Sequence, residues 1–369
     1  MIHYYLSLAS FLILSFGCTP KTKEFDTESD EYQQDTGESD DSDGILEPTS
    51  EPTTEPEDQE SVAFSEYVDP NCIDGQYADL ETFPTPNIDI SYDINNYNSS
   101  NYVQFIYDVL AARYPIGHYL VQGGMESEGY FSENCIDFFL YNTSSAQSVI
   151  FELSTVVHEC GHFFNVNSSG WGENVYHITD TIRYTCTDGS IPSNGGGVMF
   201  SRSLIKQDEY NALYPPCSTT GGSNCDFYAD TYLNGNPNDG NFESGDQGFG
   251  MLLEETVQYV NSLATGYAFH DFYGSTSITE RDGILTFLWY TQRYLKMARE
   301  QYPNAYQKIS QDPNWREAIL TIWGRSWFYL EHTKNISVLG IHDDFIESLV
   351  TDSDLLEEIE RLREIQGCQ

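Results

Sequence analysis

Apolar residues recur every three to four positions in six stretches of the chain, which is the spacing of a buried helical face. The predicted helices cover residues 102–113, 147–164, 251–263, 284–300, 315–330 and 355–365. A capping box at residues 144–147 is expected to begin the second helix. Its predicted buried face consists of Val149, Leu153, Val156, Cys160 and Phe163. Gly367 is expected to end the last helix, because glycine readily adopts the left-handed conformation that follows many helices.

Three short stretches near the start of the globular part predict β-strands, at residues 88–92, 118–121 and 136–141. Pro115 and Gly117 are expected to end the helix that precedes the second strand. Residues 165–248 are rich in Gly, Asn, Asp, Ser and Pro, which predicts mainly loops. Strands followed by helices predict an α+β fold, in which a small mixed sheet precedes a mainly helical C-terminal lobe.

The first 18 residues contain no Asp, Glu, Lys or Arg and are predicted to be a targeting segment. Residues 6–16 form an apolar stretch of signal-peptide length, which is too short to cross a bilayer. The stretch ends in Leu-Ser-Phe-Gly-Cys at residues 14–18, which resembles the lipobox of bacterial lipoproteins. This resemblance implies a signal peptide at residues 1–17, a lipid on Cys18, and export to the outer membrane or cell surface. The alternative is an ordinary cleaved signal peptide on a secreted protein.

The next segment is strongly acidic, with 16 Asp and Glu but only two Lys in residues 19–60. It cannot bury enough apolar surface to fold, and repulsion between its charges extends it. We therefore expect residues 18–70 to be a disordered acidic tether. The composition becomes globular from about residue 70, which predicts a core domain at 71–275 and a helical lobe at 276–369.

The net charge of the chain argues against negatively charged binding partners. The 369 residues include 16 Lys and Arg against 58 Asp and Glu, which gives a formal net charge of −42. Nucleic acids and anionic bilayers repel such a chain, so neither is an expected partner. No apolar run reaches the roughly 20 residues of a spanning helix, so membrane attachment is expected only through a lipid on Cys18.

Seven cysteines follow Cys18, and export to an oxidising compartment favours disulfide bonds among them. Cys217 and Cys225 are close enough in sequence to close a short loop. Cys160 is expected to pack in the core or to form a disulfide. Because seven is an odd number, at least one thiol is expected to stay free or to pair with another molecule.

Residues 158–162, His-Glu-Cys-Gly-His, match the HExxH pattern and lie within the helix predicted at 147–164. Residues four positions apart share one face of a helix, so His158 and His162 can bind one Zn²⁺ at about 2.0–2.1 Å. Zinc lowers the pKa of a bound water from about 15.7 to about 7. Glu159 is placed to take a proton from that water and to pass it to the leaving amine. Gly161 should cost the helix about 1 kcal/mol relative to Ala, which indicates a close approach of another backbone or of the substrate.

A catalytic zinc ion needs a third protein ligand and one open position. Residues 250–260 resemble the ligand helix of gluzincins, in which a Glu after a Leu is followed by a small residue and then a Tyr. The resemblance places Glu254 at the ligand position, with Val257 and Tyr259 at the other two. The separation from the HExxH motif is much longer than in better-known gluzincins, so other ligands stay open: Glu255, His177 and Asp180.

Segments 154–164 and 250–261 together resemble zincin peptidases. The resemblance implies a zincin-like fold with its sheet packed on the HExxH helix and zinc in a cleft between two lobes. It also implies a zinc metallopeptidase that hydrolyses peptides or proteins outside the cytoplasm, with the strand at 136–141 holding an extended substrate. One of four side chains is expected to stabilise the oxyanion: Tyr259, Tyr267, His270 or Tyr273. The alternative function is a non-catalytic zinc-binding surface lipoprotein in adhesion or scaffolding.

Overall fold

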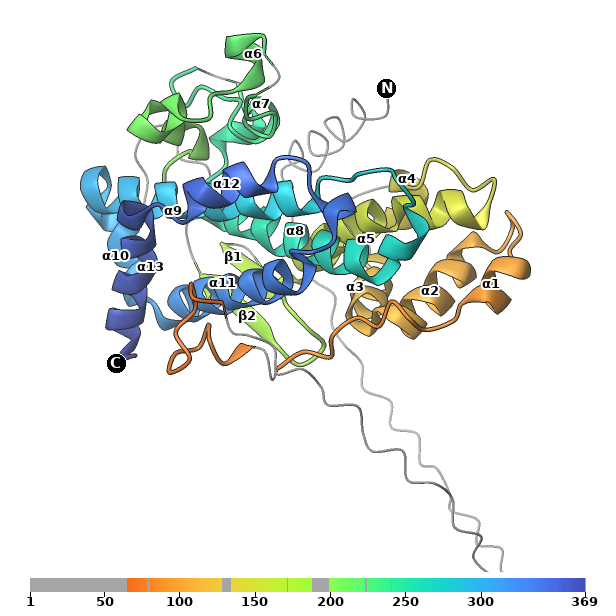
Figure 1. Cartoon of the computed structure of the whole chain (residues 1–369). Helices are drawn as coiled ribbons and strands as arrows, with labels where there is room; N and C mark the ends of the chain where they lie inside the picture. The colour runs from red at the N-terminus through yellow and green to blue at the C-terminus, as the bar shows by residue number, and fades with distance from the viewer. Residues whose placement is uncertain are drawn as a thin grey trace, which may run out of the picture. The chain divides into compact units, whose positions relative to one another are not determined.

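The computed structural model of the chain describes residues 65–77, 80–127, 134–170, 172–187, 199–222, 224–239 and 241–368 (Figure 1). The predicted signal peptide, the lipidation site Cys18 and the tether up to residue 64 lie outside these residues. No described helix is both long enough and apolar enough to cross a bilayer. The end of the predicted tether contacts the folded body, since the backbone oxygen of Tyr67 accepts hydrogen bonds from Trp323 and Arg363.

Most of the described residues lie in α-helices. The first seven are α1 (Ser91–Asn95), α2 (Tyr102–Arg113), α3 (Pro115–Met125), α4 (Cys135–Phe139), α5 (Ala146–Ser168), α6 (Cys217–Thr220) and α7 (Ala229–Tyr232). Six more follow: α8 (Phe249–Phe269), α9 (Glu280–Gln301), α10 (Pro303–Gln311), α11 (Pro313–Thr333), α12 (Asp343–Val350) and α13 (Ser353–Gln366). Short 3₁₀ helices lie at Arg202–Gln207, Glu209–Ala212, Ser244–Asp246, His270–Phe272 and Ser337–Leu339.

All six helices predicted from apolar spacing are confirmed, as α2, α5, α8, α9, α11 and α13. The cap of α5 lies one residue later than predicted, because the Ser145 side chain accepts a hydrogen bond from the backbone N–H of Ser148. Gln147 does not complete a capping box, since its side chain donates to the backbone oxygen of Phe272. All five residues of its predicted apolar face are buried. Gly367 ends α13 in the left-handed conformation, at φ 88°. The sequence prediction omits α10 and α12, which are only nine and eight residues long.

The three predicted strands are wrong. Residues 118–121 lie within α3, and Pro115 begins this helix rather than ending the one before it. Proline suits the first turn of a helix because the N–H that it lacks would have no partner there. Residues 136–141 form most of α4 and the chain after it, and residues 88–92 lead into α1. Short apolar runs do not distinguish a strand from a buried helix, which explains these errors.

Among the described residues, the structure has one sheet, and it lies within residues 165–248, which are predicted to be mainly loops. Strands β1 (Glu173–His177) and β2 (Arg183–Thr187) form an antiparallel pair, with Glu173 opposite Thr187 and His177 opposite Arg183. β1 packs on α5, and β2 packs on α11. The fold is therefore mixed but mostly helical. A small sheet does pack on the HExxH helix, but it is an antiparallel hairpin that follows this helix instead of a mixed sheet that precedes it.

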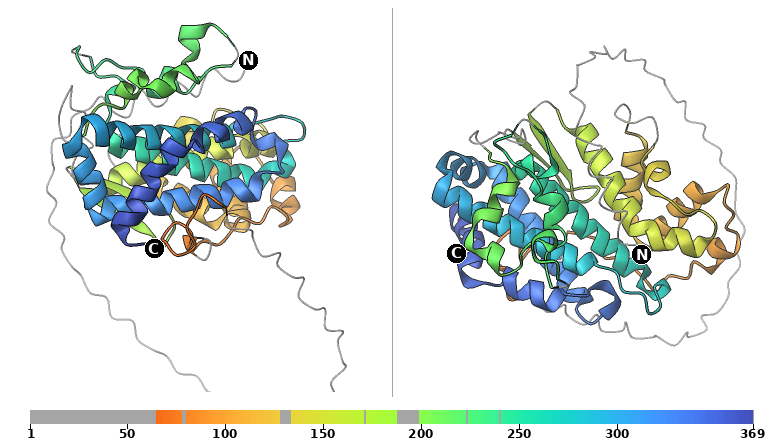
Figure 2. Two further views of the ribbon diagram at one scale, coloured as in Figure 1. Left: turned by 60° about the vertical axis from the view of Figure 1, so that its left-hand side comes forward. Right: turned by 90° about the horizontal axis from the view of Figure 1, so that it is seen from above.

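Two long helices, α5 and α8, pack against each other and carry the HExxH segment and the paired glutamates (Figures 1 and 2). α3 packs on α5, while α9 and α11 pack on α8. α10, α12 and α13 pack in turn on α9. Residues before and after position 275 belong to one compact unit. Helices α9 and α11 of the predicted C-terminal lobe therefore pack against α8, the helix that carries the paired glutamates.

Disulfide bonds join three pairs of the described cysteines: Cys72–Cys368, Cys135–Cys160 and Cys217–Cys225. The predictions for Cys160 and for the short Cys217–Cys225 loop are confirmed. The bond to Cys135 ties the HExxH helix to α4, and it turns Cys160 away from the histidines into the core. Cys186 is free and buried, in agreement with the odd number of cysteines. Burial raises the pKa of its thiol, so it is a packed thiol rather than a reactive one.

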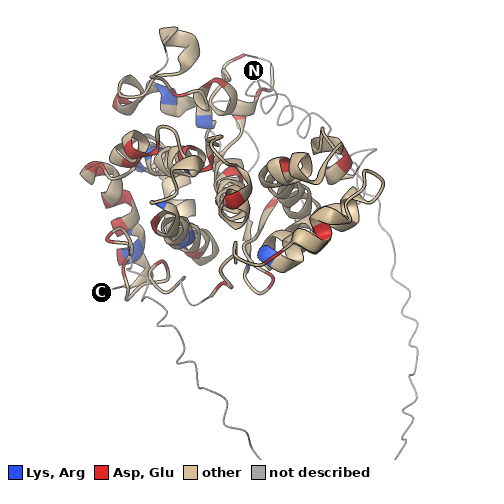
Figure 3. Ribbon diagram, turned by 45° about the vertical axis from the view of Figure 1, so that its right-hand side comes forward, with Lys and Arg blue, Asp and Glu red and all other residues tan. Residues whose placement is uncertain are grey.

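Acidic side chains are spread over the helices of the folded body, while Lys and Arg are few (Figure 3). Several of the arginines are internal, so they do not offset this charge at the surface. Buried arginines that pair with a carboxylate include Arg113, Arg281, Arg293, Arg325 and Arg363. Some of the paired carboxylates are buried as well, such as Asp74 and Glu81, so these pairs neutralise charge inside the folded body.

Glu280 at the start of α9 predicts a pH dependence of stability. Its Oε2 is buried without a hydrogen-bond partner, and burial raises the pKa to about 7 although Ser154 on α5 donates a hydrogen bond. Folding therefore favours the protonated acid, and this contribution falls as the pH rises from about 4.5 to about 7. Between pH 5 and pH 8, ionisation of Glu280 should lower the free energy of unfolding of the wild type by about 2 kcal/mol. Glu280→Gln should lack this decrease.

Urea unfolding at the two pH values measures this difference. Glu364→Gln changes an exposed glutamate on α13 and is the matched control, for which the wild-type pH dependence should persist. Equal pH dependence of the wild type and Glu280→Gln would contradict the expectation.

Candidate metal centre

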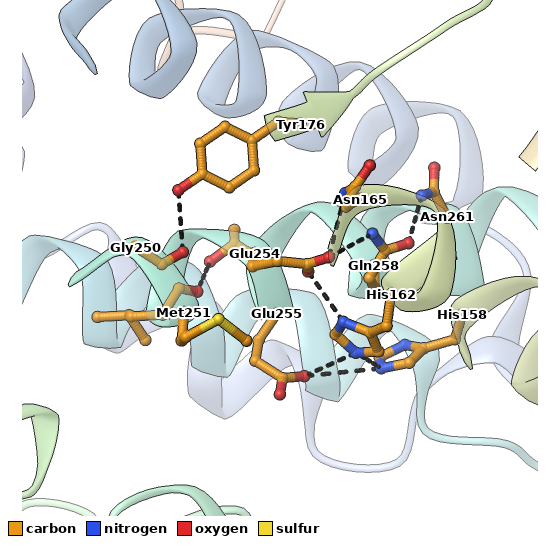
Figure 4. Close-up of polar contacts among 12 residues, drawn as sticks. His158, His162, Asn165, Tyr176, Gly250, Met251, Glu254, Glu255, Gln258 and Asn261 are labelled. Atoms are coloured by element: carbon orange, nitrogen blue, oxygen red, sulfur yellow. Dashed lines mark hydrogen bonds and ion pairs between the residues drawn. The ribbon is translucent and has the colours of Figure 1, made fainter. Parts of the chain in front are cut away.

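The packing of α5 on α8 brings the two sequence motifs together (Figure 4). A Cβ atom on Gly161 would lie 2.0 Å from Oε1 of Gln258, so only glycine at this position lets the Gln258 side chain lie against α5. The sequence predicts a close approach at Gly161 by backbone or substrate, and the structure shows that a side chain of α8 makes it. The helices therefore lie near enough for both histidines to face the glutamates.

Three side-chain atoms converge between these helices. The Nε2 atoms of His158 and His162 are 3.1 Å apart, and Oε2 of Glu255 lies 3.6 Å and 3.4 Å from them, respectively. Tetrahedral coordination with bonds of about 2.0–2.1 Å places neighbouring ligand atoms about 3.3–3.4 Å apart. The three observed distances lie around this value. His158, His162 and Glu255 can therefore hold a metal ion.

One ion pair and one hydrogen bond behind the imidazoles orient them for this role. Nδ1 of His162 lies 3.0 Å from Oε2 of Glu254, and Nδ1 of His158 lies 3.0 Å from Oγ of Ser262. A carboxylate only accepts hydrogen bonds, so His162 carries its proton on Nδ1 and presents an Nε2 lone pair to the centre. Oε2 of Glu255 is buried and has no hydrogen-bond partner. A cation between these atoms would satisfy all of them.

The electrostatics also favour positive charge at this point. Burial alone lowers the pKa of His162, but the charges of Glu254 and Glu255 outweigh it and raise the pKa well above its ordinary value. Burial alone raises the pKa of Glu255, but His162 lowers it below its ordinary value. Burial raises the pKa of Glu159, against the charges of His158 and His162. The centre therefore combines an ionised Glu255 with a neighbouring carboxyl group that is more basic than usual.

Glu254 and Glu255 have different places in this arrangement, and the preferred ligand of the sequence prediction is not the one that faces both Nε2 atoms. Glu254 lies behind His162, and its Oε1 accepts hydrogen bonds of 3.1 Å from Asn165 and from Gln258. Successive helical residues point about 100° apart, so only one of the two glutamates can face the Nε2 pair. The group that can hold a metal contains Glu255 instead of Glu254. The sequence gives no sign of the helix rotation that decides between them.

The two other alternative ligands lie outside this group. Nδ1 of His177 is 3.0 Å from the Tyr119 hydroxyl, and its Nε2 is 3.1 Å from Oγ of Ser168. Burial, together with the charge of Arg183, lowers the pKa of His177 to about 4. Asp180 is exposed at the turn of the hairpin. His177 therefore links β1 to α3 and α5, and neither residue belongs to the group that can hold a metal ion.

Of the four residues proposed to stabilise an oxyanion, Tyr259 lies next to the histidines. Its ring packs edge to face on His158, with centroids 4.8 Å apart, and its hydroxyl lies 3.0 Å from that of Tyr232. The other three pack against side chains or backbone elsewhere: Tyr267, His270 and Tyr273. Tyr259 is thus the member of this set that contacts a histidine of the candidate site.

The sequence analysis misses Arg202, which lies in the stretch predicted to be loop. It is fully buried, and it donates to the backbone oxygen of Tyr232 at 2.7 Å and to Oγ of Ser244 at 2.7 Å. Burial lowers the pKa of Arg202, while the charge of Glu255 opposes this shift. Arg202 therefore supplies a buried positive charge near the glutamates. A single arginine in a loop-rich stretch gives no signal of such a role.

Comparisons of the chain with protein-family models, with curated proteins and with solved structures find no match. The fold and the candidate site therefore describe the chain as a mostly helical protein. It contains a buried group of two histidines and one glutamate that can hold a metal ion.

Proposed function

We propose that the protein is an exported zinc metallopeptidase of zincin-like organisation. In this proposal His158, His162 and Glu255 are the zinc ligands and Glu159 is the general base. The observation that carries it is the set of three ligand-atom distances, which suits tetrahedral coordination by three protein ligands. Bound there, zinc would polarise a carbonyl oxygen and lower the pKa of a water molecule to about 7.

Glu159 is adjacent to a ligand histidine and is nearly fully buried. A carboxylate in this setting takes the proton of the attacking water and delivers it to the nitrogen of the leaving amine. Burial raises the pKa of this carboxyl group, which makes it a stronger base than an ordinary glutamate. The hydroxyl of Tyr259, whose ring packs on His158, is the proposed donor to the developing oxyanion.

The proposed substrates are peptides or proteins outside the cytoplasm. Three disulfide bonds support the assignment of the protein to an oxidising compartment. Attachment through a lipid on Cys18, with residues 19–64 as a polar tether, remains part of the proposal. Tethering of this kind would hold the folded body near a membrane surface without inserting it.

Burial of the centre favours a second candidate function, a non-catalytic zinc-binding lipoprotein in adhesion or scaffolding. The possible ligands and the base are only 4–6% exposed: His158, Glu159, His162, Glu254 and Glu255. A structural zinc site is closed in this manner, whereas a catalytic site needs room for substrate.

Metal analysis combined with peptide cleavage distinguishes these functions. We expect the protein, purified without chelator, to contain one zinc ion per chain and to cleave members of a mixed peptide library. A chelator should remove both the zinc and the cleavage, and added zinc should restore both. One bound zinc without cleavage would favour the structural candidate. Folded protein without zinc would exclude both functions.

A further inference from the structure

Three buried hydrogen bonds and one ion pair form a continuous line from Arg325 on α11 to His162 on α5 (Figure 4 shows all of its members except Arg325). Arg325 Nη1 donates to Oδ1 of Asn261 at 2.6 Å, and Nδ2 of Asn261 donates to Oε1 of Gln258 at 2.9 Å. Nε2 of Gln258 then donates to Oε1 of Glu254 at 3.1 Å. The other oxygen of Glu254 faces Nδ1 of His162 at 3.0 Å. We call this line the Arg325 relay.

Arg325 sets the direction of every hydrogen bond in the relay. A guanidinium group only donates, so Asn261 must turn its oxygen toward Arg325 and its NH₂ group toward Gln258. Gln258 must then turn its oxygen toward Asn261 and its NH₂ group toward Glu254. Neither amide can flip without placing like groups against each other. The Gln258 amide thereby holds Oε1 of Glu254, and the other oxygen of this carboxylate faces Nδ1 of His162.

The starting point of the relay is firmly held. Nε of Arg325 donates to Oε2 of Glu81 at 2.7 Å, and this ion pair is almost completely buried. Nη2 of Arg325 donates to the Tyr114 hydroxyl at 3.0 Å, and Tyr329 donates to Glu81. Because both charges are buried and paired, Arg325 cannot turn away from Asn261 without a large cost.

The side-chain amide of Asn165 also holds Glu254, and its orientation is likewise set by a group that can only donate. Nδ2 of Asn165 donates to Oε1 of Glu254 at 3.1 Å, and Oδ1 of Asn165 accepts from the backbone N–H of His177 at 3.0 Å. A backbone N–H only donates, so the Asn165 amide is also oriented by its neighbour. Two NH₂ groups consequently meet at one oxygen of Glu254, and its other oxygen remains available to His162.

Gly161 inside the HExxH segment makes room for this relay. A Cβ at this position would collide with Oε1 of Gln258, which is the atom that accepts from Asn261. The relay thus depends on the motif itself. Glycine at the second variable position of HExxH leaves the space that the Gln258 side chain of α8 occupies.

We propose that Arg325, Asn261 and Gln258 are positioning residues of the candidate metal centre, which hold the Glu254 carboxylate in place behind Nδ1 of His162. This inference rests on the proposed function, because it requires a metal at that site. Partners that orient a ligand histidine typically contribute about 10- to 100-fold to metal affinity. Through the relay, residues that do not contact the metal would contribute part of this increase in metal affinity.

Asn261→Asp is the sharpest test, because the new carboxylate still accepts from Arg325 but cannot donate to Gln258. The Gln258 amide should then turn its oxygen toward Glu254, which removes a donor from that carboxylate. We expect zinc affinity, measured by competition with a chromophoric chelator, to fall about 10- to 100-fold. The visible absorption of the Co²⁺-substituted protein should change as well, since the geometry of one ligand changes.

Gln258→Met interrupts the relay with an apolar side chain of similar size and should lower zinc affinity to a similar extent. Gln292→Met is its matched control. Gln292 is a buried amide on α9 that donates to the backbone oxygen of Val350, outside the relay. The control should keep the zinc affinity and the Co²⁺ spectrum of the wild type.

Wild-type zinc affinity and Co²⁺ spectrum in both Asn261→Asp and Gln258→Met would overturn the relay while leaving the metal centre intact. An equal loss in Gln292→Met would also overturn it, because any buried amide would then have the same effect. Absence of zinc from the wild type would overturn the proposed function itself, and this result appears before any substitution is made.

Discussion

Replacing Glu159 by Gln is expected to reduce peptide cleavage by about 10²- to 10⁴-fold while one zinc ion stays bound. The amide keeps the size and position of the side chain, but it cannot take a proton from the attacking water. Glu159 is not part of the group that can hold the metal, so the ion should remain. The measurement is kcat/KM on a peptide identified from the library, with the zinc content determined on the same sample.

Glu152→Gln is the matched control for this experiment. Glu152 lies two turns earlier on α5, and its carboxylate accepts from the backbone N–H groups of Tyr141 and Asn142. An amide oxygen can still accept these bonds, so activity and zinc content should both be unchanged. Retained cleavage in Glu159→Gln would show that another group is the base. Loss of zinc in Glu159→Gln would instead show that Glu159 helps to bind the metal.

The long elements of this fold can be predicted because each has a full apolar face and a distinct end. α5 is the clearest case, with Ser145 as its cap and five buried residues along one side. Gly367 marks the end of α13 equally well. Local chemistry determines such features, so it can be recognised in the sequence without any knowledge of tertiary contacts.

The short elements depend on their neighbours, and there the sequence misleads. The apolar run of α3 is buried between α2 and α5, and this burial on both sides obscures the helical period. The hairpin of β1 and β2 lies in a stretch whose composition is typical of loops, and it is held in place by α5 and α11. Neither arrangement can be inferred from local patterning, because tertiary packing decides both.

The same limit applies within the candidate site. His158, Glu159 and His162 follow from one motif on one helix, so the sequence predicts them together. The partners of these residues come from α8 and α11, and they depend on how those helices rotate and pack. Arg202 and Arg325 leave no sequence signal at all, although both are buried charges close to the centre or connected to it. Motifs thus identify the chemistry, and the structure identifies what holds it.

The second large effect is expected from the choice between the two glutamates. Glu255→Gln should weaken zinc binding by well over the roughly 100-fold upper value for an orienting partner, because a charged ligand becomes a weak neutral one. Glu254→Gln should weaken it by only about 10- to 100-fold, since the amide oxygen can still accept from Nδ1 of His162. Competition with a chromophoric chelator measures both affinities under one set of conditions.

The two substitutions make the same chemical change at consecutive positions of α8, so each is the control for the other. Both remove one negative charge from the centre, and a purely electrostatic contribution would lower the affinity equally in the two variants. A much larger loss in Glu255→Gln would therefore identify coordination and not charge as the cause. The reverse order, with Glu254→Gln the weaker binder, would place Glu254 on the metal as the gluzincin resemblance implies. In that case α8 would have to rotate by about 100° relative to α5, and the Arg325 relay could not form.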